Sequence, residues 1–341
     1  MIVFAWEGFP QYAARCVGAF VKATNESVVV VATRPAVPIK GMEVLCGCPV
    51  TWIDDGPIKL GKIDTLFVSG WGIPAFNRLR DEVRVNGGRV IGLVDNNFIF
   101  SFKEILRAIR FRLFIRRHYD AFMVPGKSGR KLLRFYGVPD GKIKEGLYAA
   151  DDTLFTPGPP LEKRPKKIIY VGQFCARKNV LRMCRAFLNA KLDGWALVLY
   201  GSGPLKEELE GISSNAREGV DGTIEVHGFL QPEELAAKYR EARFFLLPSI
   251  EEHWGLVVHE AALSGCLLLL SKYIGAADDF LVAGENGWLF DPFDVDDMTC
   301  AIKRTMELDD VTMADMRLKS LQLSHNASLN KFVGVVRTIV G

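Results

Sequence analysis

Two carboxylates eight residues apart are the side chains of this sequence best suited to separate chemical roles. Glu252 and Glu260 lie in segment 248–260, in which Pro248 ends an apolar run and Gly255 precedes a stretch of helical spacing. The free N–H groups of a helix N-terminus can face an anion. One carboxylate beside that terminus can bond the hydroxyls of a reacting sugar, and the other those of a ribose. The alternative is a solvated glutamate and a structural one, although an acid among apolar side chains rarely lacks a role.

Cationic side chains stand in an earlier segment, 171–179. Gly172 follows an apolar run, and Arg177 and Lys178 come just before a stretch of helical spacing. Backbone N–H groups, the helix dipole and two cations together suit a phosphate group. A basic loop with solvated side chains is the other interpretation of these residues.

Two glycine-containing segments give weaker signals. In segment 200–204, Gly-Ser-Gly-Pro follows an apolar run and precedes a helical stretch. This is a weak signal of a ligand-binding loop, and a simple tight turn is the alternative. We interpret segment 284–290 as a turn that closes the side of the pocket, with an ordinary glycine turn as the alternative.

Short apolar runs alternate with longer segments of helical spacing along the whole chain. In the first half, strands are predicted at 2–6, 27–32, 43–46, 65–69, 89–94 and 121–124, and helices at 11–23, 75–86, 102–117 and 128–136. In the second half, strands are predicted at 168–171, 196–200, 223–226, 244–247 and 267–271, and helices at 180–189, 205–211, 232–241, 256–264, 295–306 and 312–323. This alternation predicts an α/β fold with parallel sheets covered on both faces.

A segment rich in Pro, Gly and charge, 155–167, separates the two series and cannot continue a helix or a central strand. We therefore predict an N-terminal domain over 1–160 and a C-terminal ligand-binding domain over 161–324. A last helix at about 325–341 is expected to pack back on the first domain. Two doubly wound domains place a ligand in the cleft between them, at the carboxyl ends of the strands.

Composition and charge exclude several classes of protein. The 341 residues are 49% hydrophobic and carry a net charge of +3, too small to indicate a nucleic-acid partner. The sequence has no apolar run of about eighteen residues, and it begins like a strand rather than a signal peptide. Cys46 and Cys48 lack the further ligands of a zinc site. We expect a cytoplasmic protein with free thiols and no metal.

Taken together and in order, these segments resemble the family 4 glycosyltransferases, a large retaining family with the GT-B fold. The resembling segments are 172–179, 201–204, 226–229, 248–265 and 284–289. The paired-glutamate segment matches without a gap and is the specific one. The resemblance covers about residues 120–310 and is faint before residue 120. It implies an α/β protein with two doubly wound Rossmann-like domains that face a cleft.

The resemblance also implies roles for single residues. Lys178 would bind the diphosphate of a nucleotide-sugar donor, Glu252 would contact the donor sugar near the reacting carbon, and Glu260 would bond the ribose. The backbone N–H groups of Gly255 and Leu256 would bind phosphate. The other residues expected to bind the donor lie at strand ends or in the loops that follow: Gly8, Gly172, Gln173, Arg177, Gly201, Gly228, Phe229, His253 and Trp254.

The sequence departs from the family pattern at two places. Gln173 stands where the family has an arginine, which removes one cation from the diphosphate site, and we expect Arg177 to compensate. Many members also carry a histidine near the sugar in the first domain. Asp95, in segment 92–98, is the best substitute here, with an Asn- and Asp-rich turn as the alternative.

The implied reaction is retaining transfer, without an essential metal or other cofactor, of a hexose-type sugar from a nucleotide-diphosphate sugar. A glycan or lipid-linked acceptor in surface polysaccharide or glycolipid synthesis is expected. A nucleotide-sugar epimerase, a phosphorylase and a non-catalytic nucleotide-sugar binder remain open. A nicotinamide dehydrogenase is disfavoured, because Trp-Glu-Gly-Phe-Pro at 6–10 is not the glycine fingerprint of that class.

Segment 102–117 combines an apolar stripe with six flanking cations. The stripe is Phe102, Ile105, Leu106, Ile109 and Leu113. Such a helix can lie on an anionic membrane surface, which would make the protein peripheral on the inner face of a membrane. A half-buried helix with a solvated basic side is the alternative.

Overall fold

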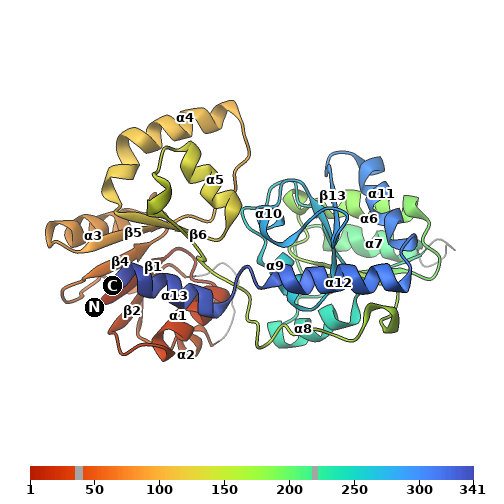
Figure 1. Ribbon diagram of the computed structural model, residues 1–341, viewed down its shortest axis with the longest axis horizontal. Helices are drawn as coiled ribbons and strands as arrows, with labels where there is room; N and C mark the ends of the chain where they lie inside the picture. The colour runs from red at the N-terminus through yellow and green to blue at the C-terminus, as the bar shows by residue number, and fades with distance from the viewer. Residues whose placement is uncertain (35–40, 217–221) are drawn as a thin grey trace. The chain divides into compact units, whose positions relative to one another are not determined.

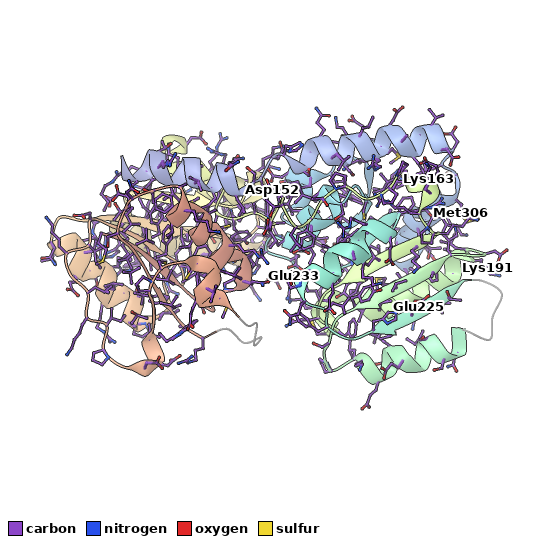
Figure 2. All side chains as sticks on the ribbon, turned by 90° about the horizontal axis from the view of Figure 1, so that it is seen from below. Asp152, Lys163, Lys191, Glu225, Glu233 and Met306 are labelled. Atoms are coloured by element: carbon purple, nitrogen blue, oxygen red, sulfur yellow. The ribbon has the colours of Figure 1, made fainter. Side chains whose placement is uncertain are left out.

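The computed structural model describes residues 1–34, 41–216 and 222–341, which form two compact units (Figure 1). Unit 1 contains Met1–Asp151 and Ala327–Gly341, and unit 2 contains Asp152–Asn326. The sequence placed the first boundary after residue 160, whereas the chain enters unit 2 at Asp152, which is labelled in Figure 2.

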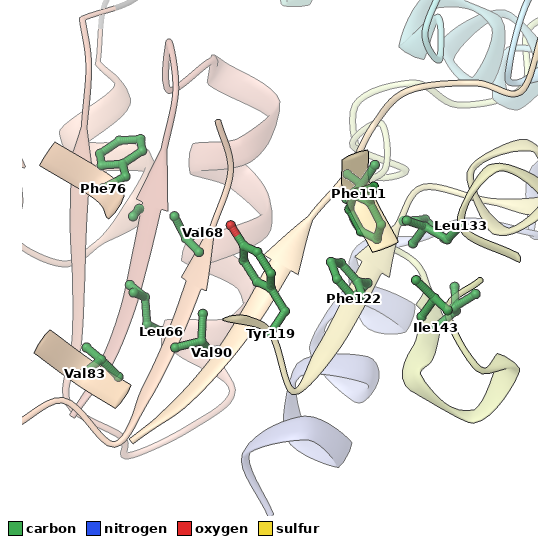
Figure 3. Close-up of a cluster of buried hydrophobic side chains, with 14 of the residues drawn as sticks. Leu66, Val68, Phe76, Val83, Val90, Phe111, Tyr119, Phe122, Leu133 and Ile143 are labelled. Atoms are coloured by element: carbon green, nitrogen blue, oxygen red, sulfur yellow. The ribbon is translucent and has the colours of Figure 1, made fainter. Parts of the chain in front are cut away.

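Within the described residues, unit 1 is built on a seven-stranded parallel sheet in the order β3-β2-β1-β4-β5-β6-β7. The strands are β1 (Ile2–Trp6), β2 (Val28–Ala32), β3 (Val50–Trp52), β4 (Thr65–Val68), β5 (Arg89–Leu93), β6 (Ala121–Val124) and β7 (Ile143–Glu145). The α-helices are α1 (Gln11–Lys22), α2 (Met42–Cys46), α3 (Pro74–Val85), α4 (Phe102–Arg110), α5 (Lys127–Phe135) and α13 (Leu329–Val340). Apolar side chains of the strands and of the helices beside them form the core cluster drawn in Figure 3, which includes Leu66, Val90 and Phe122.

The described part of unit 2 is built on a six-stranded parallel sheet in the order β10-β9-β8-β11-β12-β13. The strands are β8 (Lys167–Val171), β9 (Ala196–Tyr200), β10 (Thr223–His227), β11 (Phe244–Leu247), β12 (Leu267–Ser271) and β13 (Gly287–Phe290). The α-helices are α6 (Val180–Ala190), α7 (Lys206–Ala216), α8 (Pro232–Glu241), α9 (Leu256–Leu263), α10 (Ala277–Phe280), α11 (Val295–Lys303) and α12 (Asp310–Ser324). Strands β11 and β12 are buried along their whole length, as expected of a parallel sheet with both faces covered.

One predicted strand is wrong, since segment 43–46 lies in the short helix α2. Gly41 and Gly47 flank it in left-handed conformations, with φ of 78° and 61°. The helix packs so closely on α1 that a Cβ on Gly18 would lie 2.0 Å from the carbonyl oxygen of Leu45. Four residues are too few to distinguish a helical from an extended period. The other predicted strands are confirmed to within one residue at each end.

The Pro-rich segment 155–167 packs onto unit 2 through a buried cation. The guanidinium of Arg164 donates to the carbonyl oxygens of Pro159 at 2.8 Å, Ala242 at 2.7 Å and Ser264 at 2.9 Å. Ala242 and Ser264 follow α8 and α9, so these carbonyls carry the partial negative charge of helix C-termini. Burial lowers the pKa of Arg164, and the carbonyl dipoles compensate for the charge.

The last helix, α13, belongs to unit 1 and packs beside α1 (Figure 1). Its Phe332 lies against Phe4 of β1, with ring centroids 6.2 Å apart. None of the helices in the described part of the chain combines the length and apolar character needed to cross a bilayer.

Candidate active site

The predicted site residues of unit 2 gather around the carboxyl ends of its parallel strands. From β8 the chain moves to β9 and β10 on one side of the sheet, and then to β11, β12 and β13 on the other. The loops after β8 and β11 therefore lead to helices on opposite faces. In open α/β sheets, ligands bind outside the carboxyl ends of the strands at such a point of reversal.

The loops after β8 and β9 are joined by their backbones. Phe174 N donates to Ser202 O at 2.8 Å. A Cβ on Gly201 would lie 1.9 Å from Gly172 O, and a Cβ on Gly203 would lie 2.5 Å from Phe174 O. The Gly-Ser-Gly segment is therefore more than a tight turn, because its glycines allow the two loops to meet.

Lys178 and Glu252 form an ion pair that joins the loops after β8 and β11. Lys178 Nζ contacts Glu252 Oε2, and the two side chains are only 9% and 13% exposed. Arg177 lies 3.8 Å from the same carboxylate oxygen. The sequence assigned Lys178 and Glu252 to opposite ends of a donor and did not predict their contact. Two cations face one carboxylate here, and this excess of positive charge suits an anion.

Two further side chains, which the sequence did not single out, position this pair. Ser249, fully buried after β11, donates its hydroxyl to Glu252 Oε2 at 3.1 Å. Asn179 adopts a left-handed conformation with φ of 58°, and its Nδ2 donates to Pro292 O at 2.7 Å. The Pro-Ser pair at the end of an apolar run was the available signal for Ser249.

The segment before α9 is fixed by both its backbone and its glycine. Gly275 N donates to Glu252 O at 3.1 Å, and Ala276 N donates to Trp254 O at 2.9 Å. Gly255 begins α9 with φ of 90°, a conformation that favours glycine. The first N–H groups of α9 and the Lys178–Glu252 pair thus both lie just beyond the carboxyl ends of β8 and β11.

Residues 153–320, about half of the chain, match the model of the family described as glycosyl transferases group 1. Unit 2 belongs to this family. The sulfoquinovosyl transferase SQD2 of Arabidopsis thaliana is 28% identical over 204 residues, covering 56% of this chain and 38% of that protein. The O-antigen chain mannosyltransferase B of Escherichia coli is 27% identical over 197 residues, covering 53% of this chain and 50% of that protein. The chain spans half or less of the length of these two relatives.

The whole chain is similar in fold to several solved structures. The structure of HepE from Anabaena in complex with UDP has a TM-score of 0.78 at 14% identity, covering 99% of this chain and 98% of that one. The structure of the same protein with UDP and glucose has a TM-score of 0.76, with the same coverage. The predicted fold class, α/β of GT-B type with two doubly wound Rossmann-like domains, is confirmed.

Glu260 lies on the second turn of the group 1 domain's α9 and accepts a hydrogen bond from Tyr239 Oη at 3.1 Å. Although part of the residue reaches solvent, burial of its carboxyl raises its pKa from 4.5 to about 7. A raised carboxyl pKa means that the folded state holds the proton more tightly than the unfolded state. Glu260 therefore lowers the free energy of unfolding as the pH rises from about 4.5 through about 7, where its carboxyl loses the proton.

We predict that Glu260→Gln becomes more stable relative to the natural protein as the pH rises from 5 to 8, by on the order of 1–2 kcal/mol. At pH 8, where the natural carboxyl is charged, nucleoside diphosphate binding should weaken, because the ribose hydroxyls lose a charged acceptor. Urea unfolding and calorimetric titration at both pH values measure the two effects. A stability difference that is the same at pH 5 and pH 8 would show that Glu260 is not a perturbed acid.

Gln173, the departure from the family's arginine, is an exposed residue in the loop after β8. We therefore predict that Gln173→Arg folds normally and binds nucleoside diphosphate as tightly as the natural protein, or more tightly. The measurement is calorimetric titration beside thermal unfolding. A variant that unfolds or binds much less tightly would show that position 173 does not face the diphosphate.

The remaining predicted donor residues of the group 1 domain differ in accessibility. Phe229 is 49% exposed in the loop after β10, beside Gly228. His253 is exposed and lies 3.6 Å from a carboxylate oxygen of Glu251. Trp254 is only 4% exposed, and its ring packs on Phe280 with centroids 5.7 Å apart. The predicted donor contact of Trp254 stays a prediction.

Gly8 and Asp95 belong to unit 1, so they are not part of the group 1 domain. Gly8 follows β1 with φ of 62°, and its N–H donates to Thr33 Oγ1 at 2.5 Å. Asp95 follows β5 and is half-buried. Both residues lie at the carboxyl edge of the unit 1 sheet, where doubly wound units bind ligands. The predicted contact of Asp95 with the donor sugar stays a prediction.

The turn at 284–287 does not close the candidate site, and that prediction is wrong. β13 runs parallel to β12 with Gly287 level with Leu268, so the turn before it lies at the amino ends of the strands. Lys178 and Glu252 follow the carboxyl ends. Asn286, which is fully buried, fixes the turn by accepting a hydrogen bond from Val282 N at 2.8 Å. In the described residues, no three His, Cys, Asp or Glu side chains gather as metal ligands.

Proposed function

We propose that the protein is a retaining glycosyltransferase that moves a hexose-type sugar from a nucleotide-diphosphate sugar to a glycan or lipid-linked acceptor. The observation that supports this most is the Lys178–Glu252 pair beside the N-terminus of α9, at the reversal point of the sheet. Membership of unit 2 in the group 1 family agrees with it. UDP and glucose bound to the structurally similar HepE support the donor class.

In the proposed reaction, Lys178, Arg177 and the first N–H groups of α9 hold the donor diphosphate. The bond between the anomeric carbon and the diphosphate oxygen breaks, and the diphosphate leaves with the electron pair. The acceptor hydroxyl attacks the anomeric carbon from the same face and gives its proton to the leaving diphosphate oxygen. Glu252 bonds hydroxyls of the donor sugar, and Glu260 bonds the ribose.

The cationic side chains and the helix N-terminus would offset the charge of the leaving group without a metal. We assign acceptor binding to unit 1. The proposed setting is surface polysaccharide or glycolipid synthesis, with the enzyme in the cytoplasm or at the inner face of a membrane.

The test is turnover of nucleotide-diphosphate sugars with and without glycan and lipid-linked acceptors. Nucleoside diphosphate release that depends on acceptor, with a product that keeps the anomeric configuration, is the expected result. An inverted product would contradict the retaining mechanism. Conversion of the nucleotide-sugar without any acceptor would favour an epimerase, and binding without turnover would favour a non-catalytic binder.

A further inference from the structure

Segment 100–118 of unit 1 carries α4 and its continuation, and we call it the α4 segment. After α4, the chain continues through a π-helical turn (Phe111–Ile115) and a 3-10 turn (Arg116–His118). The face toward the core carries Glu104, Ala108 and Phe111, all buried. Phe111 packs on Phe122 with ring centroids 5.5 Å apart (Figure 3), so this face packs against the core of unit 1.

The opposite face of the α4 segment is apolar and lies in solvent. Its large side chains are between 49% and 85% exposed. They are Phe102, Leu106, Ile109, Leu113 and Phe114. Most of the stripe found in the sequence is thus on the outer surface, with only Ile105 half-buried. This decides against the alternative of a half-buried helix with a solvated basic side, because an ordinary surface helix turns its apolar stripe inward.

Cations flank this outer row, and no exposed acid accompanies them. Glu104, the only acid of the segment, is buried and accepts a hydrogen bond from Tyr136 Oη. Arg112 donates to Phe135 O at 2.7 Å, at the end of α5. Lys103 and Arg110 make no ion pair among the described residues, so their charges face solvent. The exposed surface therefore consists of large apolar side chains and positive charge.

We propose that the α4 segment is an interfacial helix that docks on an anionic lipid bilayer. A single helix with an outward apolar row and flanking cations can place the row among acyl chains and the cations at anionic headgroups. A second copy of the chain fits this surface poorly, because pairing would bring like charges together. This inference builds on the proposed function, since a lipid-linked acceptor would be met at that bilayer.

The test is co-sedimentation of the full chain with phosphatidylcholine vesicles, with and without phosphatidylglycerol. The natural protein should bind only the anionic vesicles, and added salt should weaken binding. Leu106→Gln/Leu113→Gln should reduce the partition coefficient about tenfold or more, because two apolar side chains leave the acyl region. Lys103→Glu/Arg110→Glu should remove the preference for anionic lipid.

The matched control is Val85→Gln/Leu318→Gln, which changes two apolar side chains on other helices that are 87% and 60% exposed. It should bind vesicles like the natural protein. Equal sedimentation with neutral and anionic vesicles would overturn the proposal, as would undiminished binding of the Leu106/Leu113 variant. Two further results would overturn it. One is light scattering that shows a dimer of the natural protein and a monomer of this variant. The other is binding of the natural protein to an acidic protein but not to vesicles.

Nucleoside diphosphate binding, measured on the same samples, separates this inference from the proposed function. The surface variants should retain it, because none of the residues assigned to the donor lies in the α4 segment. If vesicle binding behaves as expected and no nucleotide binds, the proposed donor chemistry fails while the lipid surface stands. If the natural protein and all variants bind nucleotide equally and none of them binds lipid, the lipid-docking proposal fails while the proposed donor chemistry stands.

Discussion

Lys178→Ala is expected to lose about a hundredfold or more in kcat/KM, which corresponds to about 2.7 kcal/mol of transition-state stabilisation. The diphosphate gains negative charge as the sugar leaves, so a buried cation beside it acts more strongly in the transition state than in the ground state. Lys178 is 8% exposed, and little water screens its charge. Free nucleoside diphosphate should also bind more weakly, as calorimetric titration beside steady-state kinetics would measure.

The matched control for this change is Lys319→Ala. Lys319 Nζ lies 2.6 Å from Glu285 in the same unit, so the control also breaks a lysine–glutamate pair, but one that the reaction does not use. It should keep natural turnover and nucleotide affinity. Thermal unfolding of both variants shows whether the loss of the partner of Glu252 damages the fold. If folded Lys178→Ala turns over like the control, Lys178 does not hold the leaving group.

Glu252→Gln is expected to cut turnover on the order of a hundredfold while nucleoside diphosphate affinity stays the same or rises. The substitution keeps the shape of the side chain and removes the charge that bonds sugar hydroxyls. It also removes the ion-pair partner of Lys178, which frees that cation for the diphosphate. This pattern differs from that of Lys178→Ala, in which turnover and affinity fall together.

Glu251→Gln is the control, because Glu251 is the exposed neighbour of Glu252 in the same loop. It should behave like the natural protein in both measurements. If Glu252→Gln and Glu260→Gln both keep natural turnover, the interpretation of the paired glutamates is wrong, and with it most of the case for a glycosyltransferase.

The sequence predicted the elements that carry the site better than the contacts within it. The strands before Gly172 and Pro248 are short apolar runs that end in glycine or proline, and such patterns depend on local sequence alone. The Lys178–Glu252 pair joins residues 74 positions apart. The pair can form because β11 lies next to β8 in the sheet. Local sequence patterns do not predict the order of strands.

The errors arose where tertiary contacts override a local pattern. The turn at 284–287 has the composition of a site loop, yet the parallel direction of β13 puts it at the other edge of the sheet. The sequence predicted the apolar stripe of segment 102–117 correctly. Only the structure shows that this stripe faces solvent rather than the core.

The measurement that tests the central claim most directly is a thermal-shift panel of UDP-, GDP-, ADP- and CMP-sugars on the natural protein, Lys178→Ala and Lys319→Ala. A ligand that binds only the folded state raises its stability with occupancy. We predict that sugars of one nucleotide stabilise the natural protein and the Lys319 control, and that this shift is largely lost in Lys178→Ala. No shift with any nucleotide-sugar, or an equal shift in all three proteins, would contradict a donor site built around Lys178 in unit 2.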